Sequence, residues 1–473
     1  MGSDASHPAD GDASVAPQSP DDAAEANEPP SPSDDGKGLG KAAARGTIWV
    51  FGAFGLQQAA RLGGNVLLSR LLFQEAFGIM RVLNVVVTVV GMLSDAGLRG
   101  SIIFHKRGDE PDFYNTAWTL QCLRGLAVAV VVSSLAVPLA KFYELPDLAV
   151  LLPVVGLSIV FRGAQSTAVF TLSRHVKPKP FALLDVTVRI SALVITVILA
   201  TFWKSVWVLA LGMVLTNVGH GFFTHFLIKG YRNRWRWDKA AVRDQVSFGK
   251  WVFISSALAA LLGQGGSMVV AKLLTVKLLG VYSMALMLSE APVQALNAVA
   301  RSVLQPLYAK FVSGNKKQFR GRLLRVRAAL LALFLPLLWI PGVFGQEIVD
   351  LLFDERFTQA GWMLRVLMIG VIGTSIISTV ELLFVASGES RTHLVHKAWG
   401  AGLFIVALAI GWTLGEFPGL LIGYSAGRAA GYVPMAVLLA RRGAWQPKLD
   451  GLAFLASALV LGLGFYVHPL VIP

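Results

Sequence analysis

The chain has 473 residues, of which 55% are hydrophobic and only 15% charged, whereas about 25% of the residues of a soluble protein are charged. The formal net charge is +14, and residues 1–36 contain nine acidic residues and no Lys or Arg, so the rest of the chain carries +23. This composition excludes an ordinary soluble protein, and the single cysteine, Cys122, excludes an intrachain disulfide.

The chain begins with a polar segment that cannot bury a core. Residues 1–36 are rich in Pro, Ser, Ala and Asp and contain no aromatic residue, a composition typical of disorder. The segment lacks the basic start and the apolar stretch of a signal peptide. We therefore expect residues 1–44 to form a disordered, acidic, cytoplasmic tail, either inert or engaged with a partner.

Apolar runs of about 20 residues follow along the whole chain, which is the length that crosses the hydrocarbon core of a bilayer. They predict an all-α polytopic membrane protein with 12–14 transmembrane helices. We read thirteen spans, at residues 46–69, 77–103, 113–140, 148–172, 181–202, 205–228, 251–271, 281–309, 328–343, 359–387, 398–412, 419–440 and 451–467.

The loops between these spans alternate in charge. Twenty-four Lys and Arg lie in residues 104–111, 172–180, 229–250, 310–327, 391–397 and 441–448, and six lie in the alternate loops. Under this span count every basic loop falls on one side, which the positive-inside rule makes cytoplasmic, together with the N-terminus. Basic residues placed in short loops are a signal for membrane insertion, so we expect no nucleic-acid partner.

A short motif recurs at an offset of 202 residues. Arg70-Leu71-Leu72 precedes Gly78-Ile79-Met80, and Lys272-Leu273-Leu274 precedes Gly280-Val281-Tyr282. The repeat predicts two pseudo-symmetric six-helix lobes, residues 45–230 and 251–442, around a central site. A basic cytoplasmic linker, residues 231–250, would join the lobes, and residues 443–473 would add one extra C-terminal helix.

Nine arginines and no lysine lie inside the apolar spans. They are Arg61, Arg81, Arg99, Arg124, Arg162, Arg189, Arg301, Arg365 and Arg428. Charges in hydrocarbon are costly and usually face a wet cavity or a partner. Several lie on polar stripes at helical spacing, such as Gln57, Arg61 and Asn65. Such stripes serve either as interhelical contacts or as the wall of a hydrated cavity, and their number favours a central cationic cavity.

Four intramembrane carboxylates accompany the arginines: Asp95, Asp185, Glu290 and Glu381. Asp185 and Arg189 are four residues apart and can neutralise each other. Because arginines outnumber carboxylates, the interior favours an anionic substrate, and the forked guanidinium suits phosphate. A cation exporter would favour an acidic interior.

No pattern of catalytic, metal-ligating or nucleotide-binding residues accompanies these charges. The eight His have no metal-ligand spacing, and the chain lacks a Gly-x-x-x-x-Gly-Lys-Ser/Thr loop. We therefore expect no enzymatic activity, no metal and no cofactor.

Four short motifs occur along the chain: Leu71-Leu72 with Phe77-Gly78, Ser94-Asp95-Ala96-Gly97-Leu98, Phe181 after the basic loop Arg174–Lys179, and Leu279-Gly280-Val281-Tyr282-Ser283 with Pro292 and Pro306. They resemble motifs of Wzx-type polysaccharide flippases of the multidrug/oligosaccharidyl-lipid/polysaccharide exporter superfamily. Their order and spacing agree over residues 40–445. At one place the chain departs from many relatives, which have an acidic residue where it has Gly266 and Ser267.

The resemblance implies a flippase that moves undecaprenyl-diphosphate-linked oligosaccharides to the periplasmic leaflet of the bacterial inner membrane by alternating access. This substrate, membrane lipids, and glycan polymerase and chain-length proteins would be its partners, and it would act as a monomer. The product would feed exopolysaccharide, capsule or O-antigen synthesis. The alternatives are a cation-coupled multidrug exporter of the same fold and a non-transporting scaffold for glycan enzymes.

On this hypothesis two groups of residues form the site. Arg61, Arg124 and Arg162 would hold the diphosphate and acidic sugars. The full set expected to bind substrate is Gln57, Arg61, Asn65, Arg124, Arg162, Arg189, Arg301 and Arg428. Asp95, Asp185, Glu290 and Glu381 would tune the charge or carry a coupling proton.

Overall fold

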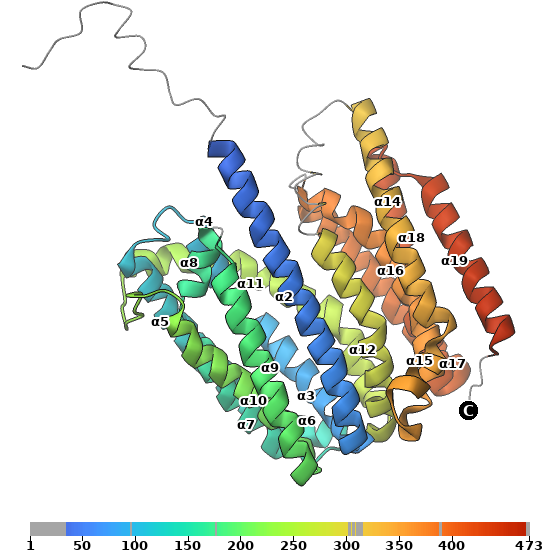
Figure 1. Ribbon diagram of the computed structural model, residues 1–473, viewed down its shortest axis with the longest axis horizontal. Helices are drawn as coiled ribbons and strands as arrows, with labels where there is room; N and C mark the ends of the chain where they lie inside the picture. The colour runs from blue at the N-terminus through green and yellow to red at the C-terminus, as the bar shows by residue number, and fades with distance from the viewer. Residues whose placement is uncertain are drawn as a thin grey trace, which may run out of the picture. The chain divides into compact units, whose positions relative to one another are not determined.

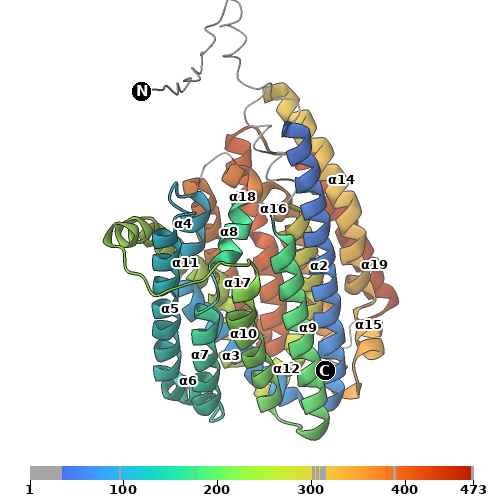
Figure 2. The same cartoon turned by 60° about the vertical axis from the view of Figure 1, so that its left-hand side comes forward.

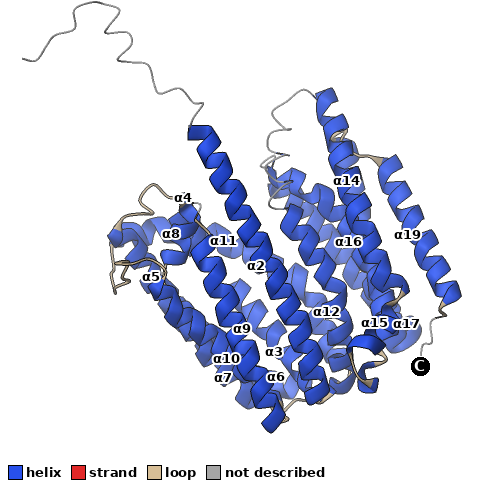
Figure 3. Cartoon of the chain, in the orientation of Figure 1, coloured by secondary structure: helices blue, strands red, loops and turns tan. Residues whose placement is uncertain are grey.

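The structure is a computed structural model that describes residues 35–94, 97–175, 177–300, 304, 308, 316–386 and 390–469. These residues form helices and no strand, as predicted (Figure 3). Its first half contains α2 (Asp35–Leu71), α3 (Gln74–Leu93), α4 (Leu98–Phe104), α5 (Pro111–Ser134), α6 (Ala136–Tyr143), α7 (Leu148–Gly163), α8 (Ala168–Arg174), α9 (Lys179–Phe202), α10 (Val206–Phe223) and the 3₁₀ turn η1 (Thr224–Phe226).

The second half begins with a long helix that starts at Lys239, inside the predicted basic linker of residues 231–250. Its elements are α11 (Lys239–Leu273), α12 (Val276–Val299), α14 (Lys316–Val343), α15 (Gly345–Leu352), the 3₁₀ turn η3 (Glu355–Phe357), α16 (Ala360–Ala386), α17 (Ser390–Ala430), α18 (Tyr432–Arg441) and α19 (Pro447–Val467) (Figure 1). Each predicted span overlaps helix, although non-helical residues interrupt some of them, such as residues 164–167 between α7 and α8 in the predicted span 148–172. Residues 1–34 of the predicted tail lie outside the described residues, and α2 begins at Asp35.

Nine described helices are long and apolar enough to cross a membrane, or ten when the pair α7 and α8, bent by 54°, counts as one span. One of the nine, Thr392–Arg441, has 50 residues and holds two of the predicted spans. The chain reverses inside α17, where Glu416 has a left-handed φ of 48°. The two arms then pack closely, because a Cβ on Gly411 would lie 2.2 Å from the carbonyl oxygen of Gly419.

The repeated motif lies where the two halves of the chain meet. A Cβ on Gly78 of α3 would lie 2.1 Å from the carbonyl oxygen of Val276, and a Cβ on Gly280 of α12 would lie 2.0 Å from that of Gln74. The contact is reciprocal, and both pairs of positions are related by the offset of 202 residues. Glycine is required on both helices because a side chain would separate the backbones.

The helices differ in how much of their surface is buried inside the protein. The spanning segment of α16 is 89% buried, whereas that of α9 is 22% buried. Leu452, Leu459 and Leu463 of α19 are mostly exposed, as expected of apolar side chains that face lipid rather than water. Helix α16 is therefore central to the second half of the chain, and α19 lies at its edge.

The loops separate into two groups, as their charges predict. Arg107 bonds Asp238 at 3.2 Å and Arg174 bonds Asp109 at 2.8 Å, which joins three basic loops of the first half. The less basic loops meet at the opposite ends of the helices, where Lys272 bonds Glu144 at 2.8 Å and Arg356 bonds the carbonyl of Leu72 at 3.2 Å. In Figure 1 the starts of α14 and α19 point toward the upper end of the view, and α6 and α15 lie at the lower end.

Candidate functional site

Helix α2 places polar side chains between the two halves of the chain. Gln57 donates to Asp185 of α9 at 2.7 Å, and its neighbour Gln58 donates to Gln294 of α12 at 3.1 Å. Figures 1 and 2 show α2, in blue, beside α9 and α12. Successive side chains of one helix therefore contact both halves. Asn65, predicted to bind substrate, donates to the carbonyl of Arg61 on its own helix at 2.8 Å.

Arg61 lies one turn after Gln57 on the same helix. Its Nε and Nη2 atoms are buried and have no hydrogen-bond partner within the part of the chain that the structure describes. The carboxylate of Glu290 on α12 attracts its charge. A buried donor without an acceptor costs about 1–3 kcal/mol. An oxygen atom that accepts hydrogen bonds from Arg61 would therefore stabilise this site.

Arg428 of α17 lies in the same region and is paired. It forms an ion pair with Glu290 of α12 at 2.5 Å and donates to Thr374 of α16 at 3.3 Å. Its guanidinium lies 5.8 Å from the centre of the Tyr424 ring. We call Gln58, Arg61, Glu290, Gln294 and Arg428 the inner polar cluster. Two arginines in this cluster share one carboxylate, so its formal charge is +1.

Asp185 forms a second centre in the first half of the chain. It accepts hydrogen bonds from Gln57 of α2 and Arg189 of α9 at 2.7 and 2.9 Å, and one of its oxygens lies 2.6 Å from Nε2 of His220 on α10. The Arg189 pairing was expected from its spacing, whereas His220, which is fully buried, had no predicted role. Arg162 of α7 is attracted by Asp185 and repelled by Arg189. We call Gln57, Asp185, Arg189 and His220 the Asp185 cluster.

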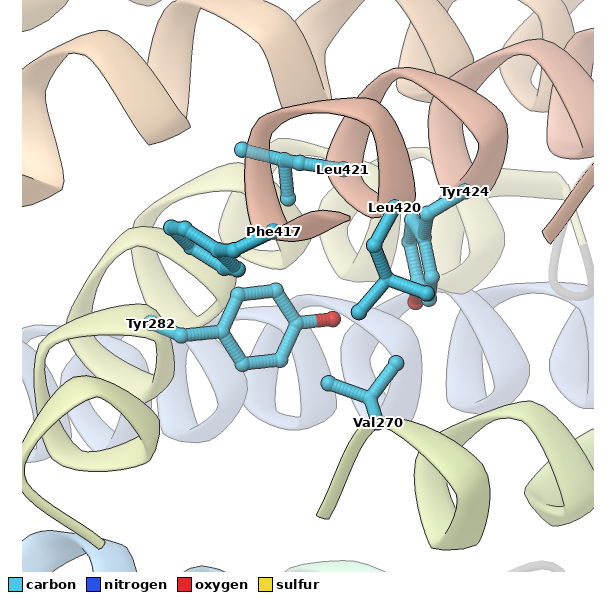
Figure 4. Close-up of a pocket in the computed structure, with 6 residues that line it drawn as sticks. All are labelled: Val270, Tyr282, Phe417, Leu420, Leu421 and Tyr424. Atoms are coloured by element: carbon cyan, nitrogen blue, oxygen red, sulfur yellow. The ribbon is translucent and has the colours of Figure 1, made fainter. Parts of the chain in front are cut away.

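A small apolar pocket lies close to the inner polar cluster. Val270, Tyr282, Phe417, Leu420, Leu421 and Tyr424 line it, and they lie too close together to admit a water molecule. Figure 4 shows these side chains converging from α11, α12 and α17. Ligand sites usually measure about 300–1,000 Å³, so this pocket is too small for a lipid-linked saccharide. The central cationic cavity expected from the sequence remains a prediction.

The other predicted residues lie apart from the two clusters. Arg124 of α5 bonds Ser94 at 3.4 Å, and Arg81 of α3 bonds Ser267 at 3.2 Å across to α11. Glu381 of α16 pairs with Lys397 at 2.5 Å. Asp95 and Arg301 lie outside the described residues.

Two further arginines, Arg99 and Arg365, also lie outside the two clusters. Arg99 of α4 is exposed. Arg365 of α16 is buried and donates to the carbonyls of Gly464 and His468 at the end of α19, at 3.2 and 2.5 Å. The described residues contain no group of His, Cys, Asp and Glu that could hold a metal ion.

Sequence analysis missed a fully buried ion pair and the hydrogen bonds around it in the second half of the chain. Arg327 was counted with a basic loop, yet it lies in α14 with no exposed surface and pairs with Asp450 of α19 at 2.5 Å. It also donates to Thr379 of α16 at 3.1 Å and to Gln446 at 3.0 Å. Tyr432 donates to the other Asp450 oxygen at 2.8 Å. Asp450, a carboxylate at the edge of an apolar span, was the available signal.

Comparisons with known proteins agree with this architecture. The model of a family described as "Polysaccharide biosynthesis protein" matches residues 67–361. The lipopolysaccharide biosynthesis protein WzxC of Escherichia coli strain K12 is 24% identical over 360 residues, which cover 76% of this chain and 72% of that protein.

Among solved structures, the lipid II flippase MurJ in an inward closed conformation is similar with a TM-score of 0.71 and 16% identity, covering 90% of this chain and 94% of that chain. An inward-facing multidrug resistance MATE family transporter gives a TM-score of 0.60 at 14% identity, covering 87% and 96%. At these identities the likeness shows the fold, which has two lobes. The comparisons group the chain with transport proteins rather than with enzymes.

Proposed function

The chain belongs to the polysaccharide biosynthesis protein family, and on this premise we propose that it is a flippase for lipid-linked oligosaccharides. It moves undecaprenyl-diphosphate-linked saccharide units between the leaflets of the bacterial inner membrane by alternating access of its two lobes. The relatives named for lipopolysaccharide biosynthesis and for lipid II flipping support this class of substrate.

The observation that carries the proposal is the Arg61 guanidinium. Two of its nitrogens are buried and lack an acceptor within the described chain, and the helix that carries them contacts both lobes. Phosphate oxygens are the acceptors that a forked guanidinium fits best. A diphosphate bound at Arg61 therefore satisfies these donors and touches the element that must move when the lobes exchange access.

The remaining predicted residues extend this site. Arg162 and Arg428 add positive charge within the bundle, and the half-exposed Arg189 adds it beside Asp185. Arg124 and Arg301 would contact the saccharide when the lobes separate. Glu290 holds Arg428 in the absence of substrate and releases it to the diphosphate. The basic loops face the cytoplasm, together with the N-terminus, so the substrate enters from the side on which the saccharide is assembled. The protein works as a monomer beside glycan polymerase and chain-length proteins.

The test is the sidedness of undecaprenyl-linked saccharide in a strain that lacks this protein. We expect the lipid to accumulate on the cytoplasmic leaflet and wild-type protein to relieve it, whereas Arg61→Ala, present at the same level, does not. Normal movement of the lipid in the deletion strain would refute the flippase assignment. In that case, transport of cationic dyes by the purified protein would identify a drug exporter of the same fold.

A further inference from the structure

The Asp185 cluster contains a histidine whose two ring nitrogens both face acceptors. His220 Nδ1 lies 2.8 Å from the carbonyl oxygen of Thr216, and Nε2 lies 2.6 Å from an Asp185 oxygen. The carbonyl oxygen cannot donate, so the hydrogen on that side belongs to Nδ1. The His220 side chain has no exposed surface, and that of Asp185 is 13% exposed. Bulk water therefore does not supply alternative partners for the ring.

A count of hydrogens then fixes the protons held by this pair. A neutral imidazole has one N–H and one bare nitrogen. With Nδ1–H directed to Thr216, a bare Nε2 would face a carboxylate oxygen at 2.6 Å, and two lone pairs at that distance repel. The contact becomes a hydrogen bond only when Nε2 or the Asp185 carboxyl carries one more proton.

The neighbouring charges act on this proton in opposite directions. The Asp185 carboxylate favours an imidazolium, whereas Arg189 on α9 and Arg162 on α7 oppose a further positive charge. Helix α2 contributes the neutral amide of Gln57. Helix α3 also packs on α10, and its interior arginine, Arg81, bonds Ser267 of the second lobe instead. Opposing influences of this kind allow the proton to be gained and lost as the surroundings change.

We propose that Asp185 and His220 form a proton-binding site that is linked to anion binding at the neighbouring arginines. This inference rests on the proposed function, because it concerns what drives the same transport cycle. An anion that draws Arg189 away removes one positive partner from Asp185, so the pair holds its proton more tightly. By reciprocity, protonation strengthens anion binding.

Helix α2 provides the structural connection between the proton and the lobes. Gln57 donates to Asp185, the adjacent Gln58 donates to Gln294 of the second lobe, and Arg61 follows one turn later. A change in the charge of the Asp185 carboxyl alters the acceptor for Gln57. The proton-binding pair is therefore joined to the diphosphate site and to the contact between the lobes through a single helix.

The proton itself is measured without substrate. We would record ¹⁵N NMR spectra of the full-length protein with labelled histidine, together with the infrared carboxyl band that Asp185→Asn removes, from pH 5 to pH 9. We expect one extra proton at the contact within this range, seen either as an imidazolium at His220 or as a protonated Asp185 carboxyl, because the hydrogen count requires it. His220→Gln identifies the resonance, and His225→Gln is the matched control. A neutral imidazole beside an ionised carboxylate throughout this range would overturn the proposal.

The linkage is measured by adding farnesyl diphosphate to the purified protein in weakly buffered solution. We expect binding to take up a proton in the wild type and in His225→Gln, and the affinity to fall about fivefold or more as the proton is lost at high pH. His220→Gln should bind without uptake. Binding without proton uptake by the wild type would overturn the linkage. Absence of binding would count against the proposed function, while the spectroscopic result would still decide whether the pair holds a proton.

Discussion

Arg61 and Arg327 both have guanidinium nitrogens that are buried in the helical bundle, and their surroundings differ. Arg327 donates to Thr379, Gln446 and Asp450. Arg61 has two buried nitrogens without an acceptor in the described residues. A buried charge is tolerated when its hydrogen bonds are complete. The comparison teaches that Arg327 fastens α14 to α19, whereas Arg61 is arranged for an acceptor that the protein itself does not provide.

The largest loss of stability is expected on replacing Arg327. Arg327→Leu leaves the Asp450 carboxylate buried without its cation, which costs about 3–5 kcal/mol in the free energy of unfolding. We expect a marked drop in the thermal unfolding temperature of the purified protein. The double variant Arg327→Leu/Asp450→Leu removes both charges and should recover part of the loss. A single variant as stable as the wild type would contradict the anchoring role.

Arg61→Ala should reduce transport and leave stability almost unchanged, which is the reverse of the effect expected for Arg327→Leu. Loss of a charged hydrogen bond to phosphate costs about 1.5–3 kcal/mol, so transport of the lipid-linked saccharide should fall roughly 10- to 100-fold. Thermal unfolding should stay close to that of the wild type, since no protein acceptor loses its partner. Arg99→Ala, at an exposed arginine of α4, is the control with normal transport. If Arg61→Ala lost thermal stability as well as transport, Arg61 would have a structural role like that of Arg327.

The loss of stability on replacing Arg428 should lie between those at Arg327 and Arg61, because Arg428 is paired with Glu290 and only partly buried. Arg428→Ala should lower the free energy of unfolding by about 1–3 kcal/mol and also weaken transport. A double-mutant cycle with Glu290→Gln separates the two effects. We expect the double variant to regain stability but not transport. Recovery of both would make the pair purely structural.

The smallest effect is expected at the surface pair of Lys272 and Glu144. The hydrogen bond and charge of Lys272 hold the pKa of the exposed Glu144 carboxyl below its usual value. Any stabilisation is therefore present above the ordinary carboxyl pKa and disappears as the pH falls through the lowered one. Lys272→Ala should return that pKa toward its usual value, as measured by NMR, without a detectable change in unfolding temperature. A clear fall in the unfolding temperature of Lys272→Ala would contradict the expectation that this exposed pair adds little stability.

The helices could be predicted because apolar length is a local property of the sequence. The repeat was also visible, since Gly78 and Gly280 keep the same spacing to their flanking residues, and the structure explains why both are glycine. The alternation of basic loops agrees with how those loops group in space.

The partners of individual charges could not be predicted in the same way. Arg327, Thr379 and Asp450 come from three helices that are separated by more than fifty residues, and a basic segment before a span resembles an ordinary loop. Glu381 was expected to tune the charge or carry a coupling proton, and nothing in its spacing indicated its pairing with Lys397. His220 is a single histidine in an apolar span, and only its packing against α9 reveals the contact with Asp185.

The most direct test of the central claim is the binding of farnesyl diphosphate to the purified protein by calorimetry. Wild-type protein and Arg99→Ala should bind with the same affinity, and Arg61→Ala should bind at least tenfold more weakly while unfolding at the same temperature. Equal affinity of Arg61→Ala and the wild type would contradict the claim that the unpaired guanidinium of Arg61 holds the diphosphate.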